Sequence, residues 1–360
     1  MNRATGVCAL AFGCTLLASP GAGTAECDRP WPDVFRETVP ATVRIVVIII
    51  DPFSLTNRVR TNAGTGVVID DEGHIVTNAH IVYGAREIAV TVDPDLDGVE
   101  SAKIVGLDAI SDIAVVRLTR PGVRLPKARL GTSEGLEIGT EVMAVGYPFG
   151  LDKSATTGIV SGSGRVVPFS PTSWLTPMLQ TDAAISPGNS GGPLVDRCGA
   201  VIGVNTLYGR KGQNLNFAVP IDTVKALVPE LIEKGRVVRP WHGIHGRLLP
   251  AMMAAAFGVE PGFLVETVEP GSPAAKIGLR GGSLRVTIGT EVFLFGGDVI
   301  TKVDGVALNN MDTVVDIVQA MKVGDVVAIE YQRQGYTITS YARLPERPLL
   351  PGDVQRFGEQ

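Results

Sequence analysis

The sequence has little net charge and no long run of basic residues. Its 360 residues include 32 basic and 37 acidic side chains, which gives a formal net charge of −5. A protein that binds nucleic acid through its phosphates usually carries a concentrated positive surface. The balance of charges in this chain therefore argues against a nucleic-acid partner.

Long hydrophobic runs are also absent beyond the N-terminal region. A helix that crosses a bilayer needs about 20 consecutive apolar residues. The run from Val46 to Ile50 is stopped by Asp51, and no later segment approaches that length. We therefore expect no integral membrane segment in the mature chain.

Glycine and proline, by contrast, are abundant. The 43 glycines and 24 prolines make up about 19 % of the chain, against roughly 12 % in an average protein. Hydrophobic residues at 45 % are enough to build sizeable cores, and a chain of this length predicts two domains. The composition indicates a globular protein in which many turns join short strands.

The first 25 residues have the plan of a secretory signal. One cation, Arg3, precedes an apolar stretch from Val7 to Ala18, and small residues follow as far as Ala25. The apolar stretch is too short to span a bilayer, and cleavage after Ala25 is expected. The alternatives are a retained N-terminal membrane anchor and a lipoprotein. We expect the mature protein to be exported.

Cleavage would leave two of the four cysteines, Cys27 and Cys198. Removal of Arg3 would leave 31 basic against 37 acidic residues, a net charge of −6. Two cysteines in an exported chain can form a disulfide, because the compartment is oxidising. The alternative is two free thiols, with Cys198 unpaired in a surface turn. Both interpretations stay open here, since a disulfide requires the two Cα atoms to lie within bonding distance.

Residues 43–220 are dominated by short runs of β-branched and apolar residues, separated by glycine, aspartate and proline. This pattern predicts strands, and so many strands without long helical patterns favour a sandwich or a pair of barrels. The clearest runs are 43–50, 64–70, 87–92, 112–118, 141–147 and 200–207. Residues 221–235 show helical spacing and a glycine stop, so a short helix closes this first domain, 26–235, despite Pro229.

A second and smaller α+β unit is predicted over 241–345, after a linker at 236–240. The predicted strands are 262–268, 297–305 and 325–333, and the predicted helices are 272–279 and 311–321. Residues 280–296 alternate polar and apolar side chains, which predicts an extra hairpin. Residues 346–360 are expected to form a short polar tail.

The stretch 181–193, TDAAISPGNSGGP, is the most informative in the chain. Ser190 stands among glycines, which permit unusual backbone dihedrals in a tight turn. Such a turn brings backbone N–H groups close to the oxyanion that a serine nucleophile creates. We expect Ser190 to be a nucleophile and the N–H groups of Gly188 and Ser190 to form the oxyanion hole. The alternative is a glycine-rich surface turn with an incidental serine.

A serine nucleophile needs a base within hydrogen-bond reach and a third group that orients the base. Of the four histidines, His80 stands where a strand pattern breaks at Thr-Asn-Ala, so its ring can lie at a strand end. His74 is expected at a solvent-facing strand start. His242 and His245 lie beyond the domain boundary. His80 is therefore the predicted base.

Asp112 is the predicted orienting acid. It begins an apolar strand, which places its carboxylate at a buried edge. Asp108 lies four residues earlier in a turn-like segment and is the other nearby candidate. The resulting triad of His80, Asp112 and Ser190 follows the chain order of chymotrypsin, unlike subtilisin or the α/β-hydrolases.

Several motifs together resemble those of the HtrA/Deg family of exported serine proteases. They are GTGVVID (64–70), EGHIVTNAHIV (72–82), SDIAVV (111–116), GYPFGL (146–151), TTGIVSG (156–162), the Ser190 string and LNFAVP (215–220). The resemblance runs over about 40–345. It implies a mainly β fold, in which a chymotrypsin-like double β-barrel precedes a PDZ domain.

The resemblance also implies roles for individual residues. His80 resembles the general base of the family, Asp112 its orienting acid, and Ser190 its nucleophile, with Gly188 contributing to the oxyanion hole. It implies hydrolysis of peptide bonds without ATP, cofactor or metal. Unfolded or damaged exported proteins in the bacterial periplasm are the implied substrates, in a quality-control role during stress.

A position before the nucleophile bears on specificity. A trypsin-like enzyme would need a carboxylate where Ala184 stands, and nothing charged is available there. Ile185 and Leu215 offer an apolar lining, which favours Val, Ile or Leu at the cleaved bond. The alternative is that Ile185 and Leu215 simply pack in the core.

The start of the second domain carries a possible peptide site. Trp241, His242, Gly243 and Ile244 match the short loop with which PDZ domains bind a peptide C-terminal carboxylate through backbone amides. The strand that follows would accept the peptide by β-augmentation. The helix 311–321, with its valines, could form the other wall or belong to the core. The insertion 280–296 departs from the usual PDZ pattern.

The resemblance implies a homotrimer or a higher multiple. The segment from Trp31 to Phe35 could supply the aromatic contacts, or it could be a loose N-terminal arm. Two other functions stay open beside general proteolysis. One is a regulatory protease with a narrow client set, and the other is a proteolytically latent chaperone or peptide-binding protein.

Overall fold

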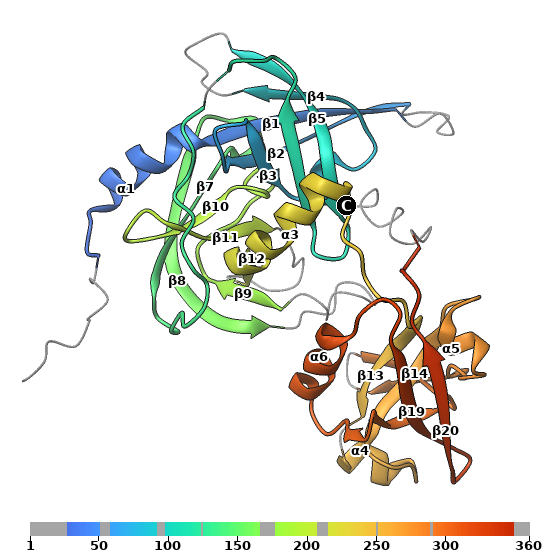
Figure 1. Cartoon of the computed structure of the whole chain (residues 1–360). Helices are drawn as coiled ribbons and strands as arrows, with labels where there is room; N and C mark the ends of the chain where they lie inside the picture. The colour runs from blue at the N-terminus through green and yellow to red at the C-terminus, as the bar shows by residue number, and fades with distance from the viewer. Residues whose placement is uncertain are drawn as a thin grey trace, which may run out of the picture.

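The computed structural model describes residues 27–50, 58–91, 98–123, 125–165, 177–206, 215–249, 251–288 and 291–348. The predicted signal peptide, 1–25, lies outside these residues, as does most of the predicted C-terminal tail. Two bodies are visible in Figure 1, a larger one built of two barrels and a smaller one with a single main sheet. The mainly β fold predicted from the sequence is confirmed.

The first barrel is closed by six antiparallel strands in the order β1-β2-β3-β6-β5-β4. Alternate residues of each strand point inward, so that Val43, Ile45 and Val47 of β1 are fully buried. A one-turn helix, α2, follows β3. The bounds are β1 (Thr42–Ile50), β2 (Val59–Val68), β3 (His74–Thr77), α2 (Ala79–Val82), β4 (Ala85–Thr91), β5 (Val99–Asp108) and β6 (Ile113–Leu118).

The second barrel repeats this architecture in the order β10-β11-β12-β9-β8-β7. The prediction of a pair of barrels is therefore right, and the sandwich alternative is not. Its strands are β7 (Glu141–Gly146), β8 (Ser154–Arg165), β9 (Met178–Thr181), β10 (Pro193–Asp196), β11 (Val201–Thr206) and β12 (Asn216–Pro220), with a 3₁₀ turn, η3 (Pro148–Gly150), after β7. The predicted closing helix is α3 (Ile221–Lys234), which ends where Gly235 adopts a left-handed conformation.

The smaller domain is a sheet in the order β13-β14-β17-β19-β20, with the short strand β18 beside β17. Helix α6 packs on it through Val314, with Ile317 and Val318 partly buried against the same core. Helix α4 was not predicted. The bounds are β13 (Ile244–Leu249), α4 (Ala251–Ala256), β14 (Gly262–Val268), α5 (Pro273–Lys276), β17 (Val299–Val303), β18 (Val306–Ala307), α6 (Met311–Ala320), β19 (Val326–Arg333) and β20 (Tyr336–Arg343).

The insertion forms the hairpin that its alternation predicts, β15 (Leu284–Ile288) and β16 (Glu291–Phe295). Phe293 and Phe295 are buried in a small core together with residues of α4 and β14. The ring of Phe257 stacks on that of Phe295, with centroids 4.0 Å apart. The hairpin thus covers the sheet next to α4 and is held by aromatic packing.

Ion pairs hold the linker between the two domains. The Arg239 guanidinium donates to the carboxylate of Asp108 at the end of β5, and Arg236 donates to Glu346 at 2.9 and 2.6 Å. Asp108 is therefore a buried strand residue, and the turn-like segment that the sequence suggested for it is wrong. Burial alone would raise its pKa, but Arg239 and hydrogen bonds from Ser111 hold the pKa below its usual range.

The N-terminal segment is a helix, α1 (Trp31–Thr38), followed by the 3₁₀ turn η1 (Val39–Ala41). Val34 is fully buried, and Trp31 and Phe35 pack against the same core. Of the two interpretations of this segment, the loose arm is therefore wrong. Its aromatic residues face the protein's own barrel, where the Arg197 guanidinium lies 5.0 Å from the Trp31 ring.

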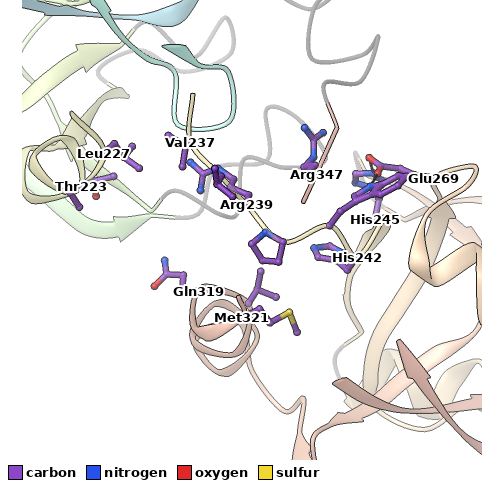
Figure 2. Close-up of a pocket in the computed structure, with 16 residues that line it drawn as sticks. Thr223, Leu227, Val237, Arg239, His242, His245, Glu269, Gln319, Met321 and Arg347 are labelled. Carbon is purple, nitrogen blue, oxygen red and sulfur yellow. Dashed lines mark hydrogen bonds and ion pairs between the residues drawn. The ribbon is translucent and has the colours of Figure 1, made fainter. Parts of the chain in front are cut away.

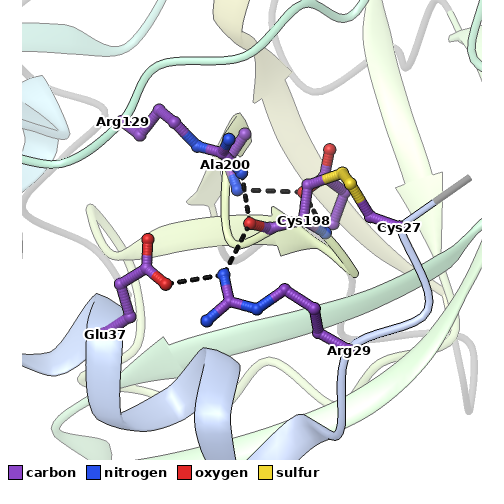
Figure 3. Close-up of a disulfide and its surroundings, with 7 residues drawn as sticks. Cys27, Arg29, Glu37, Arg129, Cys198 and Ala200 are labelled. Atoms are coloured by element: carbon purple, nitrogen blue, oxygen red, sulfur yellow. Dashed lines mark hydrogen bonds and ion pairs between the residues drawn. A yellow bond between two sulfur atoms is a disulfide. The ribbon is translucent and has the colours of Figure 1, made fainter. Parts of the chain in front are cut away.

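A disulfide joins this N-terminal segment to the β10–β11 turn, as Figure 3 shows. The Cα atoms of Cys27 and Cys198 are 5.0 Å apart. Arg29 donates to the Cys198 carbonyl at 3.0 Å and pairs with Glu37 at 2.6 Å. Arg129 donates to the same carbonyl.

Within the described residues no helix is both long and apolar enough to cross a membrane.

We expect removal of the disulfide to lower stability and leave the fold intact. The link spans 171 residues, and closing so long a loop can stabilise the native state by up to about 5 kcal/mol in the chain-entropy model. Cys27→Ala with Cys198→Ala should therefore melt at a lower temperature than the unmodified protein in calorimetry. Thiol titration of the denatured, unreduced mature protein, from which Cys8 and Cys14 have been cleaved, should find no reactive thiol. Two thiols per mature chain would contradict the link.

Candidate active site

The structure brings His80 and Asp112 into direct contact. The Nδ1 atom of His80 lies 2.8 Å from Asp112 Oδ2, and the His80 backbone N–H donates to Asp112 Oδ1 at 3.0 Å. His80 sits in α2 because β3 ends at Thr77 and Asn78 begins the helix. Asp112 immediately precedes β6 and is 1 % exposed. A buried carboxylate that faces the Nδ1 edge of an imidazole orients its other nitrogen as a proton acceptor.

Two further side chains hold Asp112, and sequence reasoning missed both. Thr206, at the end of β11 in the second barrel, donates its hydroxyl to Asp112 Oδ2 at 2.9 Å. Asn78 donates its side-chain amide to the Asp112 carbonyl at 2.9 Å. This carbonyl bond stabilises a residue whose φ of 55° is rare outside glycine. The available signals were the polar Thr206 at the end of an apolar strand and Asn78 beside His80.

The Ser190 loop adopts a tight turn that depends on two glycines. Gly188 has a φ of 104° and Gly191 a φ of 82°, both in the region that favours glycine. The Phe149 N–H donates to the Pro187 carbonyl at 2.8 Å, and the Asn189 N–H donates to Ser186 at 2.9 Å. Among the described residues, the N–H groups of Gly188 and Ser190 make no hydrogen bond. Both groups can therefore donate to a ligand, as the predicted oxyanion hole requires.

The segments that carry the predicted base and nucleophile lie on different barrels and meet at their interface. The Thr65 N–H of β2 donates to the Ser190 carbonyl at 2.8 Å. A side chain on Gly191 would collide with the Thr65 carbonyl and the Thr77 hydroxyl, three residues before His80. The interface therefore places the Ser190 loop against the end of β3, which lies just before the helix α2 that carries His80.

The predicted specificity residues differ in their burial. Ile185 is 6 % exposed and belongs to the core of the second barrel, as the core-packing alternative had it. Leu215 is 44 % exposed and lies just before β12. Ala184 is exposed, and its carbonyl accepts the Thr156 hydroxyl at 2.7 Å. The absence of a carboxylate at Ala184 is therefore the remaining argument about specificity.

His74 and His245 each pair with a carboxylate other than that of Asp112. His74 is 4 % exposed, and its Nδ1 lies 2.6 Å from Asp70 Oδ2. The expectation that His74 faces solvent is wrong, because the Asp70 carboxylate satisfies the ring at the strand start. In the second domain, His245 Nε2 lies 2.7 Å from Glu269 Oε1. No group of three or more potential metal ligands occurs in the part of the chain that the structure describes.

The loop from Trp241 to Ile244 is fixed from several sides. The Trp241 indole N–H donates to Glu269, whose backbone N–H donates to the Gly243 carbonyl at 2.8 Å. Gly243 has a φ of 73° and lies against Ser272, so a larger residue would not fit. The Ile244 N–H donates to His242 Nδ1 at 3.0 Å. One of the amides expected to meet a carboxylate is therefore occupied by a neutral imidazole in this structure.

Two cavities adjoin this loop. An apolar cavity lies between β13 and α6 and is lined by residues that include Ile244, Val314 and Val318. A second cavity, of about 420 Å³, lies between the loop, the linker and helices α3 and α6, and Figure 2 shows it. Val314 thus serves both as core and as groove wall, whereas Val315 is buried outside the cavity.

Comparisons with known protein families find a match in each domain. Residues 64–204 match the model of a trypsin-like peptidase domain, and residues 250–342 match that of a PDZ domain. The chain is 39 % identical over 307 residues to Protease Do-like 1, chloroplastic, of Arabidopsis thaliana, a match that covers 83 % of this chain and 68 % of that protein. It is 36 % identical over 282 residues to a probable periplasmic serine endoprotease DegP-like of Halomonas elongata, covering 77 % and 55 %.

The chain spans between 49 % and 68 % of the length of the curated relatives that it matches. Solved structures of similar proteins are matched almost entirely. One is the HtrA-type protease AlgW with a decapeptide, at a TM-score of 0.69 and 28 % identity, covering 89 % of this chain and all of that one. Another is a serine endoprotease from Yersinia pestis, at a TM-score of 0.64 and 28 % identity, covering 89 % and 98 %.

We expect His242 to make stability depend on pH. Burial of its ring, with a further contribution from His245, lowers the pKa of His242 to about 4, although Glu269 acts in the opposite direction. Between about pH 6.5 and pH 4 the unfolded chain binds a proton that the folded chain does not, so the free energy of unfolding falls as pH falls. Above about pH 6.5 neither the folded nor the unfolded chain protonates His242, so this residue no longer makes the free energy of unfolding depend on pH.

The measurement is urea unfolding at a series of pH values for the unmodified protein and for His242→Asn. Asparagine keeps an oxygen that accepts the Ile244 N–H but does not titrate. The difference in unfolding free energy between the two proteins should change across this window and be flat above it. Parallel curves at all pH values would contradict the expectation.

Proposed function

The chain belongs to the HtrA/Deg family of serine proteases, and we propose that Ser190, His80 and Asp112 carry out its hydrolysis of peptide bonds. The observation that supports this assignment best is the contact of His80 with the buried Asp112 at 2.8 Å. The serine loop lies at the same barrel interface, with two N–H groups that bond to no residue in the described part of the chain. Together these groups are sufficient for acyl transfer by an activated serine.

In this mechanism each residue has a distinct task. Ser190 Oγ attacks the carbonyl carbon of the substrate while His80 Nε2 takes its proton, and the carbonyl oxygen becomes an oxyanion held by the Gly188 and Ser190 N–H groups. Asp112 stabilises the imidazolium that forms. His80 then returns the proton to the leaving amine, which departs as the acyl-enzyme forms. Water repeats the sequence and releases the acid and free Ser190.

The substrates that we propose are unfolded or damaged exported proteins, cleaved without ATP in the bacterial periplasm as quality control during stress. The N-terminal secretory pattern supports export, and relatives such as the Halomonas elongata protein are named periplasmic endoproteases. We also propose that the chain assembles as a homotrimer or a higher multiple. A mass from light scattering tests this assembly, and a monomer would contradict it.

Ser190→Ala should abolish the hydrolysis of unfolded casein while leaving the fold intact. The change removes the nucleophile but leaves the backbone amides, so the rate should fall by about three orders of magnitude or more. Initial rates on labelled casein without ATP measure the loss. Ser101→Ala on the exposed part of β5 is the matched control and should keep full activity. Unchanged hydrolysis in Ser190→Ala would refute the assignment.

The same assay separates the alternatives. A regulatory protease with a narrow client set would leave casein intact yet react with an active-site serine reagent. A latent peptide-binding protein would also leave casein intact but would not react with the reagent.

We propose that Val, Ile or Leu is preferred at the residue before the cleaved bond, because Ala184 supplies no carboxylate for a basic side chain. A methylene of fit is worth about 1–3 kcal/mol, so the preference among apolar residues should be graded. Burial of an unpaired Lys or Arg charge costs much more. Mass spectrometry of casein fragments gives the cleavage sites. A map dominated by Lys or Arg would overturn the proposal.

We propose that the PDZ domain binds C-terminal peptides through the loop of Trp241, His242, Gly243 and Ile244. The apolar cavity beside Ile244 fits a C-terminal apolar side chain. The AlgW structure that the chain resembles was solved with a decapeptide. A carboxylate that reaches the Ile244 N–H would displace His242 Nδ1 from it.

Peptides with an apolar C-terminus and a free carboxylate should therefore bind, and their C-terminal amides should bind at least tenfold more weakly. The reason is that a neutral amide cannot form charge-assisted hydrogen bonds with the loop amides. Fluorescence anisotropy of labelled peptides measures both affinities. Equal affinity for the two forms would show that the groove is used in another way.

A further inference from the structure

Thr65 is fully buried in β2, yet most of its hydrogen-bonding groups serve the other barrel. Its hydroxyl donates to the Gly188 carbonyl at 2.6 Å and accepts the Tyr147 N–H at 3.1 Å. Its own N–H donates to the Ser190 carbonyl at 2.8 Å. One residue of the first barrel thus bonds to three points of the second, two through its hydroxyl and one through its backbone N–H.

These bonds fix the backbone on both sides of the proposed nucleophile. The Gly188 carbonyl belongs to the peptide unit that follows one oxyanion donor, and the Ser190 carbonyl follows the other. Gly188 and Gly191 could adopt many conformations, so the turn needs outside contacts to hold a single one. Thr65 supplies two of these contacts, and both are buried where water cannot replace them.

Thr65 is also tied to the segment that carries His80. The Thr77 hydroxyl at the end of β3 donates to the Thr65 carbonyl at 2.7 Å. The next residue, Asn78, holds the Asp112 carbonyl and begins the helix of His80. Thr65 therefore lies at the point where the base-bearing and nucleophile-bearing segments meet.

We propose that Thr65 is a positioning residue for peptide-bond hydrolysis. Through its hydroxyl it fixes the Gly188 peptide unit, and through its N–H it sets the distance of the Ser190 turn from the His80 segment. It acts through these residues and does not touch the substrate. The inference rests on the proposed roles of Ser190 and Gly188.

The test compares Thr65→Val with Thr65→Ser. Valine keeps the shape and the backbone N–H but loses the hydroxyl, so kcat on a chromogenic peptide should fall about 10²-fold with KM within about threefold, as expected when an oxyanion site is misplaced. Serine keeps the hydroxyl and should restore kcat to within about threefold of the unmodified protein. The inhibition constant of a peptide aldehyde should rise in Thr65→Val in parallel with the loss of kcat/KM, because its adduct uses the same oxyanion site.

Thr38→Val is the matched control. Its hydroxyl is also buried and donates to a main-chain carbonyl, that of Val34 at 2.8 Å, but it lies in α1. It should lower the melting temperature as Thr65→Val does and keep full kcat. If Thr65→Val does not fold, Thr65→Cys, a weak donor of similar shape to serine, takes its place beside Thr65→Ser.

The possible results are distinguishable. Full activity in Thr65→Val would overturn the positioning role, and so would a Thr65→Ser variant as slow as Thr65→Val, because the methyl group would then be the cause. An equal loss of kcat in Thr38→Val would reduce the effect to stability. Retained hydrolysis in Ser190→Ala would refute the proposed function itself, whatever the Thr65 variants do.

Discussion

The buried Asp112 carboxylate accepts its hydrogen bonds from protein donors in place of water, and the geometry of the site follows from these bonds. A buried carboxylate is costly unless hydrogen bonds replace its hydration. The backbone N–H and Nδ1 edge of His80 supply partners from the first barrel, and the Thr206 hydroxyl supplies one from the second. Because the carboxylate accepts from both barrels, displacing one barrel against the other would leave a buried charge unsatisfied. The site is therefore as rigid as the barrel interface.

The Ser190 loop, on the second barrel, is also held by hydrogen bonds that cross the barrel interface. Its glycines allow the turn but do not select it, so selection falls to bonds with Phe149, Thr65 and Asn205. The Asn205 carbonyl accepts the Gly191 N–H at 2.8 Å, and the adjacent Thr206 holds Asp112. A single strand, β11, thus fixes both the loop and the acid. The glycines make the loop flexible by itself, and the hydrogen bonds to β11 and Thr65 hold it in one conformation.

Much of this arrangement could be predicted from the sequence, because strand periodicity and the Ser190 string are local signals. The strand predicted at 43–50 is β1, and the helix predicted at 221–235 is α3. The roles of Thr206 and Thr65 could not be predicted, since a threonine in a strand is ordinary and its partner lies far away in the chain, 94 residues in the case of Thr206. The burial of His74 was missed for a similar reason, because its Asp70 partner also fits an exposed turn.

The junction of the two domains depends on the Asp108–Arg239 ion pair, in which the carboxylate is more buried than the guanidinium. The Asp108 side chain is 8 % exposed and that of Arg239 is 21 % exposed. Withdrawal of the linker would return Arg239 to water but leave Asp108 buried without its counterion, at a cost of about 3–5 kcal/mol. Asp108 also accepts from the N–H and hydroxyl of Ser111, the residue before Asp112. The start of the PDZ domain and the turn that precedes Asp112 therefore share one buried anion. The position of the linker is thus physically coupled to the conformation of the turn next to the proposed orienting acid.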